Sequence, residues 1–332
     1  MISVWSLPLL AAGGVWQAIA TYQENKQPPP GKLVRVGGRQ MHVYYLSGKA
    51  ASAEALPTVV IEHSLGGVEG YLLIEQISEF ANVCLCDRAG YGYSEMVAYP
   101  ATSSDRADAL DTALTAADIQ PPYILVGNSL GSYHSRLYAH RFPQKVAGLV
   151  LTDGLHEQNL LRMPWQLRLL QLLFFSGFCM STFGATFGIV RLFGKIGLFE
   201  LIKPELRKFS EEQRSPVLRS FYRPQHWLTM AREISNLDRC GKQLQQANAS
   251  LGNLPVINIK AQAFFKPTPL ARWLPLKAAD RLRGIMHSEL MELSERCKQV
   301  SANNSSHFVW VDQPQVIVEA IQHILFDFKQ PN

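Results

Sequence analysis

The segment from Tyr123 to Gly131 constrains the fold more than any other part of the chain. It reads Tyr-Ile-Leu-Val-Gly-Asn-Ser-Leu-Gly, an apolar β-type stretch that runs directly into the pattern Gly-x-Ser-x-Gly. The residues that follow, 132–141, contain no Pro or Gly and are compatible with a helix. A strand, a sharp turn and a helix form the context of a nucleophile elbow, in which small residues let neighbouring chain pass close by. The pattern predicts that Ser129 is a nucleophile exposed at the carboxyl end of a strand.

A second apolar stretch, from Pro57 to Gly67, also ends in small residues. Its last part reads His-Ser-Leu-Gly-Gly. A loop of this kind can point backbone N–H groups at a developing negative charge. We expect the N–H groups of Leu65 and Leu130 to form an oxyanion hole; the alternative is a turn that only connects a strand to a helix.

A general base must accompany the serine, and His307 is the best candidate among nine histidines. It follows Asn303-Asn304-Ser305-Ser306 in a polar loop, just before a helix expected over 314–328. Isoleucines and leucines on one face of that helix would pack it on a sheet, so the loop should lie at the sheet's carboxyl edge. The chain order Ser, acid, His agrees with this assignment.

The acid that orients the histidine is predicted to be Asp153. It ends the apolar stretch Val-Ala-Gly-Leu-Val-Leu-Thr-Asp, which is typical of a buried strand. Asp280 is the second candidate, and a plain loop or helix cap is the alternative role for Asp153. Asp87 also ends a strand, but we interpret it as a residue that holds its own loop in place.

Taken together, these segments resemble the α/β-hydrolase superfamily over roughly residues 28 to 328, apart from a variable middle. Ser64 stands where this family usually has Gly, and Asn128 where His is common, so each could reshape the pocket. The family also contains dehalogenases and epoxide hydrolases that use an Asp nucleophile, and Ser129 argues against both chemistries. The resemblance is to bacterial membrane-anchored serine hydrolases of the esterase and lipase type. The segments that carry it are Pro28–Gly31, His63–Gly67, Asp87–Ser94, Gly127–Gly131, Leu149–Asp153, and His307 with Asp312–Pro314.

The resemblance implies an α/β fold with a mostly parallel sheet flanked by helices and an inserted helical cap. A β-ribbon from Leu33 to Leu46, turning at two glycines, would open the fold. We expect a hydrolase core over 28–154 and 251–332, because the alternation of strands and helices stops between them. The cap is expected over 155–250. With 332 residues and 47% hydrophobic content, the chain can build one large core.

Residues 1–27 form an apolar leader in which the first charged residue is Glu24. Its length suits a membrane span or a signal anchor; the alternatives are a cleaved signal peptide and a buried helix. Basic residues follow the apolar stretch and none precedes it, which favours a catalytic domain on the cytoplasmic side. Scattered cysteines, five in all, are expected to be reduced, in agreement with this placement.

A second uncharged stretch runs from Leu169 to Val190. A membrane span there would separate Ser129 from His307, so we expect a cap helix that lines a pocket or lies in a membrane interface. Residues 155–250 hold 13 Lys and Arg against 7 Asp and Glu. This excess suits an anionic lipid surface, the alternative being a solvated basic face.

The sequence therefore predicts a serine hydrolase that cleaves carboxylic esters with apolar acyl groups, including lipids. Alternatives on the same triad are a thioesterase, an amidase, a C–C hydrolase and a cofactor-free peroxidase-like enzyme; a further alternative is a non-catalytic scaffold. The expected partners are a small-molecule or lipid ester and a membrane. No metal-ligand spacing, phosphate loop, dinucleotide fingerprint or nucleic-acid module is visible, so neither cofactor nor nucleic acid is expected.

Overall fold

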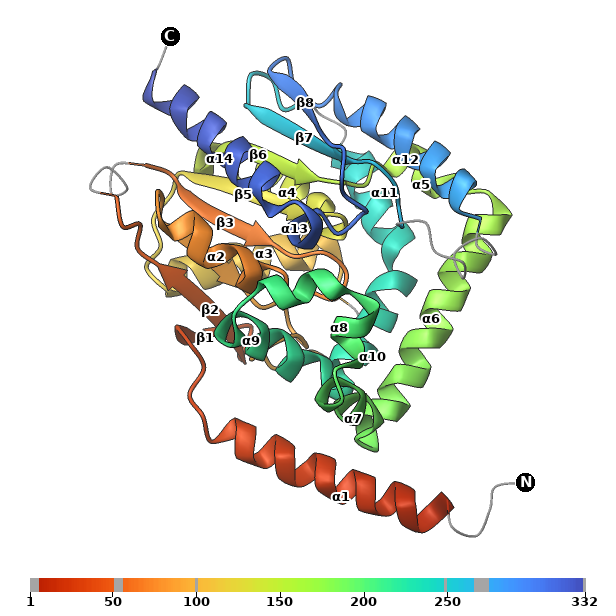
Figure 1. The fold of residues 1–332 in the computed structure, drawn as a ribbon. Helices are drawn as coiled ribbons and strands as arrows, with labels where there is room; N and C mark the ends of the chain where they lie inside the picture. The colour runs from red at the N-terminus through yellow and green to blue at the C-terminus, as the bar shows by residue number, and fades with distance from the viewer. Residues whose placement is uncertain (1–5, 51–55, 99–100, 248–249, 266–274, 331–332) are drawn as a thin grey trace.

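The fold is built on one eight-stranded sheet that is mostly parallel (Figure 1). The computed structural model describes residues 6–50, 56–98, 101–247, 250–265 and 275–330. The strand order is β1-β2-β4-β3-β5-β6-β7-β8; β1 and β2 form an antiparallel ribbon, β2 pairs antiparallel with β4, and the remaining pairs are parallel. The strands are β1 (Lys32–Val36), β2 (Arg39–Leu46), β3 (Thr58–Glu62), β4 (Val83–Cys86), β5 (Tyr123–Asn128), β6 (Val146–Thr152), β7 (Val256–Ala261) and β8 (Cys297–Ala302).

Helices cover both faces of this sheet, because its central strands are apolar on both sides. One face is covered by α2 (Gly70–Ser78), α13 (Val309–Asp312) and α14 (Pro314–Lys329), which share a core with alternate residues of the central strands. The other face is covered by α3 (Ser103–Ala116), α4 (Leu130–Arg141) and the C-terminal end of α12 (Leu276–Leu290). A short 3₁₀ helix, η2 (Pro143–Lys145), leads into β6.

The described part of the connection from β6 to β7 consists of helices joined by short loops. We call the helices α5 to α11 the cap. They are α5 (Glu157–Leu161), α6 (Trp165–Thr186), α7 (Ile189–Lys195), α8 (Leu198–Ile202), the 3₁₀ helix η3 (Pro204–Lys208), α9 (Glu211–Phe221), α10 (Pro224–Ser235) and α11 (Leu237–Ala247). The predicted α/β fold with an inserted helical cap is therefore confirmed, whereas the domain limits given above stay predictions.

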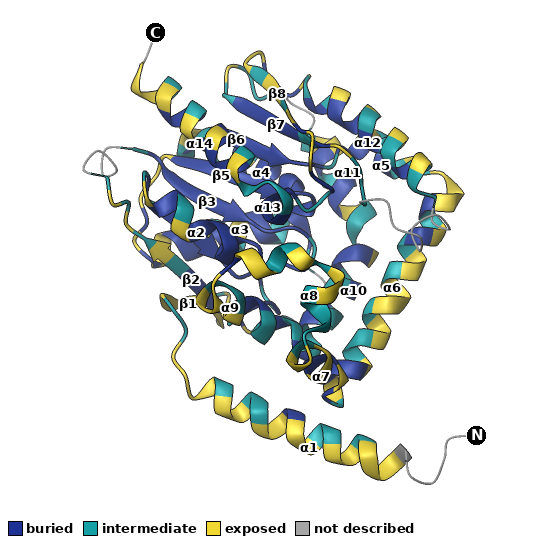
Figure 2. Ribbon diagram, viewed as in Figure 1, coloured by how far each residue is buried: buried dark blue, intermediate teal, exposed yellow. Residues whose placement is uncertain are grey.

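The uncharged stretch predicted up to Val190 is divided between two helices. The helix α6 ends at Thr186, because Gly188 takes a left-handed φ of 75° and starts α7 in a new direction. Among the described helices, α6 alone has the length and hydropathy of a membrane span, with a mean hydropathy of 1.4. It packs mainly against α10, and most of its surface is exposed (Figure 2).

The N-terminal helix α1 (Ser6–Asn25) docks on the cap through polar contacts. The buried Gln17 donates to the backbone carbonyl of Tyr222 at 2.7 Å and accepts from Arg191 at 2.7 Å. Glu24 pairs with Arg191 and, at 2.8 Å, with Arg223. The rest of the helix surface is mostly exposed, and the spanning anchor expected over 1–27 stays a prediction.

Candidate functional site

Ser129 occupies the sharp turn between β5 and α4, as the Gly-x-Ser-x-Gly pattern predicts. Its φ is 49° and its ψ is −113°, an uncommon conformation for a residue other than glycine. The turn is held by the Ser129 N–H, which donates to the Thr152 carbonyl at 2.9 Å. A Cβ on Gly131 would lie 2.3 Å from the Glu62 carbonyl oxygen, and one on Gly127 would lie 2.8 Å from the Gly131 carbonyl oxygen. Both glycines of the pattern are therefore required by close approach of backbone.

His307 and Asp153 meet at the carboxyl edge of the sheet. The Nδ1 atom of His307 lies 2.5 Å from Oδ2 of Asp153, and both residues line the same pocket as Ser129. Asp280 does not contact His307 in this arrangement. Its carboxylate accepts from the Phe264 N–H at 2.8 Å and from Arg283 at 2.9 Å. Of the two acids considered from the sequence, the structure brings Asp153 to the histidine.

The Asp153 carboxylate has two further side-chain partners that sequence reasoning missed. Arg283 donates to both of its oxygens, through Nε at 3.0 Å and through a second, shorter contact. His287 donates to Oδ1 at 3.0 Å. Burial alone would raise the pKa of Asp153, but the hydrogen bonds from His287 and His307 and the charge of Arg283 hold that pKa well below its usual value. Asp153 therefore stays ionised although it is buried.

The loop that follows β3 lies against Ser129, and a buried cation holds it. Leu65 and Leu130, the two residues expected to supply oxyanion donors, both line the pocket beside Ser129. Arg88 donates to the carbonyl oxygens of His63 at 2.6 Å and Ser64 at 2.7 Å. The cap residue Glu233 accepts from the same guanidinium at 2.9 and 3.0 Å.

A pocket of about 360 Å³ connects these groups, and its walls are overwhelmingly apolar. The cap contributes Leu167, Leu170, Phe174 and Phe178 from the inner side of α6. The core contributes aromatic side chains next to His307. The hydroxyl of Ser129, the imidazole of His307 and the carboxylate of Asp153 therefore line one hydrophobic pocket.

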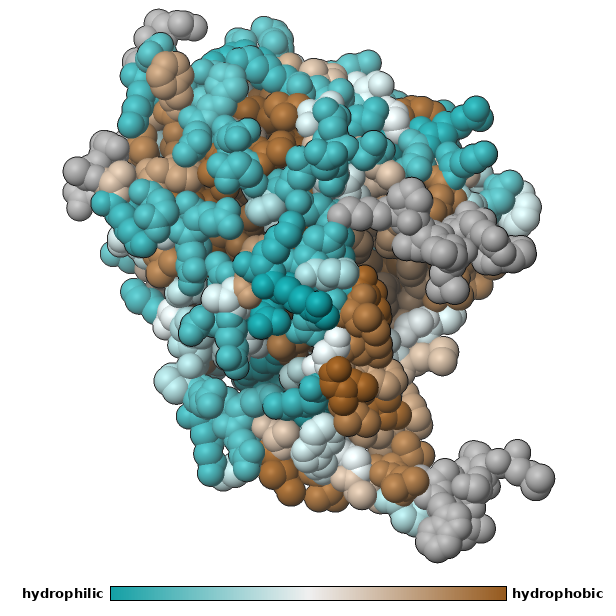
Figure 3. All heavy atoms as spheres, viewed as in Figure 1, coloured by the Kyte–Doolittle hydropathy of each residue, from teal (hydrophilic) through white to brown (hydrophobic). Residues whose placement is uncertain are grey.

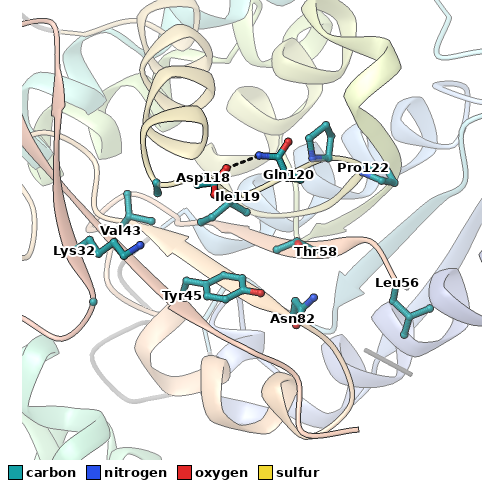
Figure 4. A pocket seen from close by; sticks show the side chains of 13 residues that line it. Lys32, Val43, Tyr45, Leu56, Thr58, Asn82, Asp118, Ile119, Gln120 and Pro122 are labelled. Carbon is teal, nitrogen blue, oxygen red and sulfur yellow. Dashed lines mark hydrogen bonds between the residues drawn. The ribbon is translucent and has the colours of Figure 1, made fainter. Parts of the chain in front are cut away.

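A second cavity, of about 580 Å³, lies at the opposite edge of the sheet, where β3 and β5 begin (Figure 4). Its walls include Lys32, Tyr45, Asn82 and Asp118, and Gln120 donates to Asp118 at 2.7 Å. It holds none of the residues predicted to be catalytic. The described residues contain no group of three or more His, Cys, Asp or Glu that could hold a metal ion.

Comparisons with known proteins agree with this architecture. The family model described as alpha/beta hydrolase fold matches residues 57–193. An uncharacterized protein of Schizosaccharomyces pombe is 33% identical over 120 residues, which are 36% of this chain and 21% of that protein. The chain thus spans about a fifth of the length of that relative. A 2-hydroxy-6-oxononadienedioate/2-hydroxy-6-oxononatrienedioate hydrolase of Paraburkholderia phymatum is 32% identical over 125 residues, 36% of this chain and 42% of the relative.

Among solved structures, the enol-lactonase from Burkholderia xenovorans LB400 is similar in fold. Its TM-score is 0.59 at 13% identity, and the match covers 89% of this chain and 100% of that one. At this sequence identity the structural similarity supports the fold alone. The matched family model, the sheet order and the strand–turn–helix at Ser129 together show that the chain has the α/β-hydrolase fold.

Proposed function

We propose that the protein is a serine hydrolase that cleaves esters with apolar acyl groups. The observation that carries the proposal is the convergence of Ser129, His307 and Asp153 on one apolar pocket, with His307 Nδ1 held by the Asp153 carboxylate. This hydrogen bond leaves Nε2 of His307 as the nitrogen that takes the Ser129 proton. Ser129 Oγ then attacks the ester carbonyl carbon.

The remaining steps follow two-step acyl transfer. The carbonyl oxygen becomes an oxyanion, which accepts hydrogen bonds from the N–H groups of Leu65 and Leu130. When the intermediate collapses, the protonated His307 gives its proton to the leaving alcohol, and the acyl group stays on Ser129. Water, deprotonated by the same imidazole, then attacks the acyl-enzyme, and the carboxylic acid leaves.

The walls of the pocket support an acyl chain as the bound group. Four apolar side chains of α6 and the aromatic Phe264, Phe308 and Trp310 surround the space next to His307. Such a surface gains from burying methylene groups, at about 0.8 kcal/mol for each CH₂. We therefore expect turnover to favour long acyl chains over acetate.

A C–C hydrolase is the second candidate, because the Paraburkholderia phymatum relative is named as a hydrolase of 2-hydroxy-6-oxononadienedioate, a name that includes a ketone group. It would use the same serine and histidine on a ketone carbonyl instead of an ester. The predicted cytoplasmic orientation of the catalytic domain stays a prediction.

Labelling with a fluorophosphonate probe tests the nucleophile. Wild-type protein should be labelled, and Ser129→Ala and His307→Ala should not, whereas Ser64→Ala is the matched control in the same pocket and should be labelled. A series of p-nitrophenyl esters should then show kcat/KM rising with acyl length. Labelling that persists in Ser129→Ala would refute the proposed nucleophile. Labelling without turnover of any ester would favour the C–C hydrolase.

A further inference from the structure

The outer side of α6 exposes large apolar side chains along most of its length. The inner side lines the pocket, and the outer side carries Leu169, Leu172, Leu173, Met180 and Phe183, of which Met180 is 75% exposed. Soluble monomers rarely expose contiguous apolar areas of more than a few hundred Å². The helix α6 is apolar on both sides, but it packs against the protein mainly through its inner side. The exposed side chains on its outer side therefore have no packing partner among the described residues.

The neighbouring helices extend the same surface. Leu192 and Ile196 are exposed on and just after α7, and Leu201 and Ile202 of α8 are 69% and 72% exposed. In the space-filling view, hydrophobic side chains gather over α7, α8 and the lower part of α6, whereas hydrophilic ones cover most of the core (Figure 3).

The helix α1 extends this surface because it is docked at the C-terminal end of α6. A Cβ on Gly13 would lie 2.4 Å from the Phe187 carbonyl oxygen, so α1 meets the end of α6 at van der Waals contact. The polar contacts of Gln17 and Glu24 with Arg191 fix its orientation. Its outward side chains include Leu9, at 72% exposure, and Ile19.

We propose that these exposed side chains of α1, α6, α7 and α8 form one membrane face, which lies on the surface of an anionic lipid bilayer. Charge supports this occupant, because exposed Lys195, Arg207 and Lys208 follow the apolar residues of α7 and α8. Basic side chains next to an apolar helix surface are the composition that binds anionic interfaces. The excess of basic over acidic residues in 155–250 disfavours a second copy of the chain, since pairing two such faces would bring like charges together.

The membrane face also connects to the proposed chemistry. The helix α6 is a wall one helix thick between the membrane face and the pocket, with Leu167 and Phe174 inward and Leu172 outward. This part of the inference rests on the proposed function. It assigns the substrate to the class of membrane lipid esters, whose acyl chain moves from the bilayer into the pocket along α6.

Vesicle co-sedimentation of the full chain tests the membrane face without relying on catalysis. We expect wild-type protein and Ser129→Ala to sediment equally with phosphatidylcholine vesicles that contain phosphatidylglycerol. Binding should fall when phosphatidylglycerol is omitted or when salt is raised. Two variants, Leu172→Glu with Met180→Glu and Leu201→Glu with Ile202→Glu, should each lower the partition coefficient by at least about tenfold. Phe326→Glu on α14 is the matched control, because it changes an equally exposed apolar residue far from the face and should bind as wild type does.

Fluorophosphonate labelling of the same variants in the absence of vesicles separates the two proposals. Variants that keep labelling and lose vesicle binding support the membrane face. Variants that bind vesicles as wild type does would overturn it. Light scattering that shows a wild-type dimer without vesicle binding, converted to monomer by the glutamate variants, would also overturn it and would assign the face to a second copy of the chain.

Discussion

At the scale of single residues, the unusual feature of the site is the number of donors around one acid. Asp153 receives hydrogen bonds from His307, His287 and Arg283, and its φ of 43° places it in a strained turn. A buried carboxylate needs such partners, because desolvation penalises its charge. Arg283 is therefore a positioning residue in the balance between desolvation, which favours the neutral acid, and the donors that keep the acid ionised and oriented.

Replacement of Arg283 by Met tests this balance. Without the positive charge the pKa of Asp153 rises toward its ordinary value, so the acid is protonated, and activity is lost, at a higher pH than in wild type. We expect the acidic limb of the kcat/KM profile to move upward in pH and kcat to fall roughly tenfold, which is about 1.4 kcal/mol. Arg283→Lys keeps the charge and should leave the limb in place. An unchanged profile in the Met variant would show that Arg283 serves packing alone.

At the scale of elements, the cap is tied to the core by buried ion pairs. Glu233 of α10 accepts from Arg88 and from the Tyr91 hydroxyl at 2.7 Å, and Arg88 in turn holds the carbonyl oxygens of the loop beside Ser129. The predicted oxyanion loop is thus coupled to a cap helix. Sequence patterns could not show this coupling, because Arg88 and Glu233 are separated by 145 residues and Glu233 lies in no recognisable motif.

The parts of the site that could be predicted from the sequence are those marked by a local pattern. The turn at Ser129, the strand end at Asp153 and the loop at His307 each follow a local apolar strand or precede an amphipathic helix, so pattern alone places them at one edge of the sheet. Arg283 and His287 lie on α12, one turn apart, and they face Asp153 only because that helix packs near β7. The end of α6 at Thr186 was not predicted either, since it depends on the left-handed backbone at Gly188.

Glu233→Gln should therefore weaken both stability and catalysis. Removal of Glu233 from this buried pair leaves Arg88 with only Glu62, at 3.8 Å, as a counter-charge, which costs about 3 kcal/mol of unfolding free energy. The loop beside Ser129 loses its support, so kcat should fall more than KM changes. Asp108→Asn breaks the exposed pair with Arg141 and should cost less than about 1 kcal/mol, with no effect on kcat. Urea unfolding and steady-state kinetics on both variants test this prediction. If Glu233→Gln and Asp108→Asn lost the same unfolding free energy and the same fraction of kcat, the coupling between the cap and the loop beside Ser129 would be contradicted.

At the scale of the whole molecule, buried titratable groups make the free energy of unfolding depend on pH, and they do so in opposite directions. Burial lowers the pKa of His226 to about 3, so its contribution is complete above the ordinary histidine value of about 6.5 and is lost as pH falls toward 3. Burial would raise the pKa of Asp312, but hydrogen bonds from Lys203 and Ser306 lower it to about 2, and its contribution is likewise lost on acidification. Glu62 behaves oppositely. Burial, only partly offset by Arg88 and Arg106, raises its pKa to about 7.

The variant Glu62→Gln tests the pH dependence that Glu62 gives to stability, which is opposite to that of His226 and Asp312. Below pH 4.5 the carboxyl is protonated in both the folded and the unfolded state, and Gln resembles it. As pH rises to 7, the unfolded chain loses this proton before the folded one does, so wild-type stability declines through that range while the variant is unaffected. The unfolding free energy of Glu62→Gln relative to wild type should therefore increase by about 2 kcal/mol between pH 5 and pH 8. The exposed Glu75→Gln is the control, whose difference from wild type should stay constant. A constant difference for Glu62→Gln as well, measured by urea unfolding at both pH values, would mean that Arg88 and Arg106 keep Glu62 ionised in the folded protein.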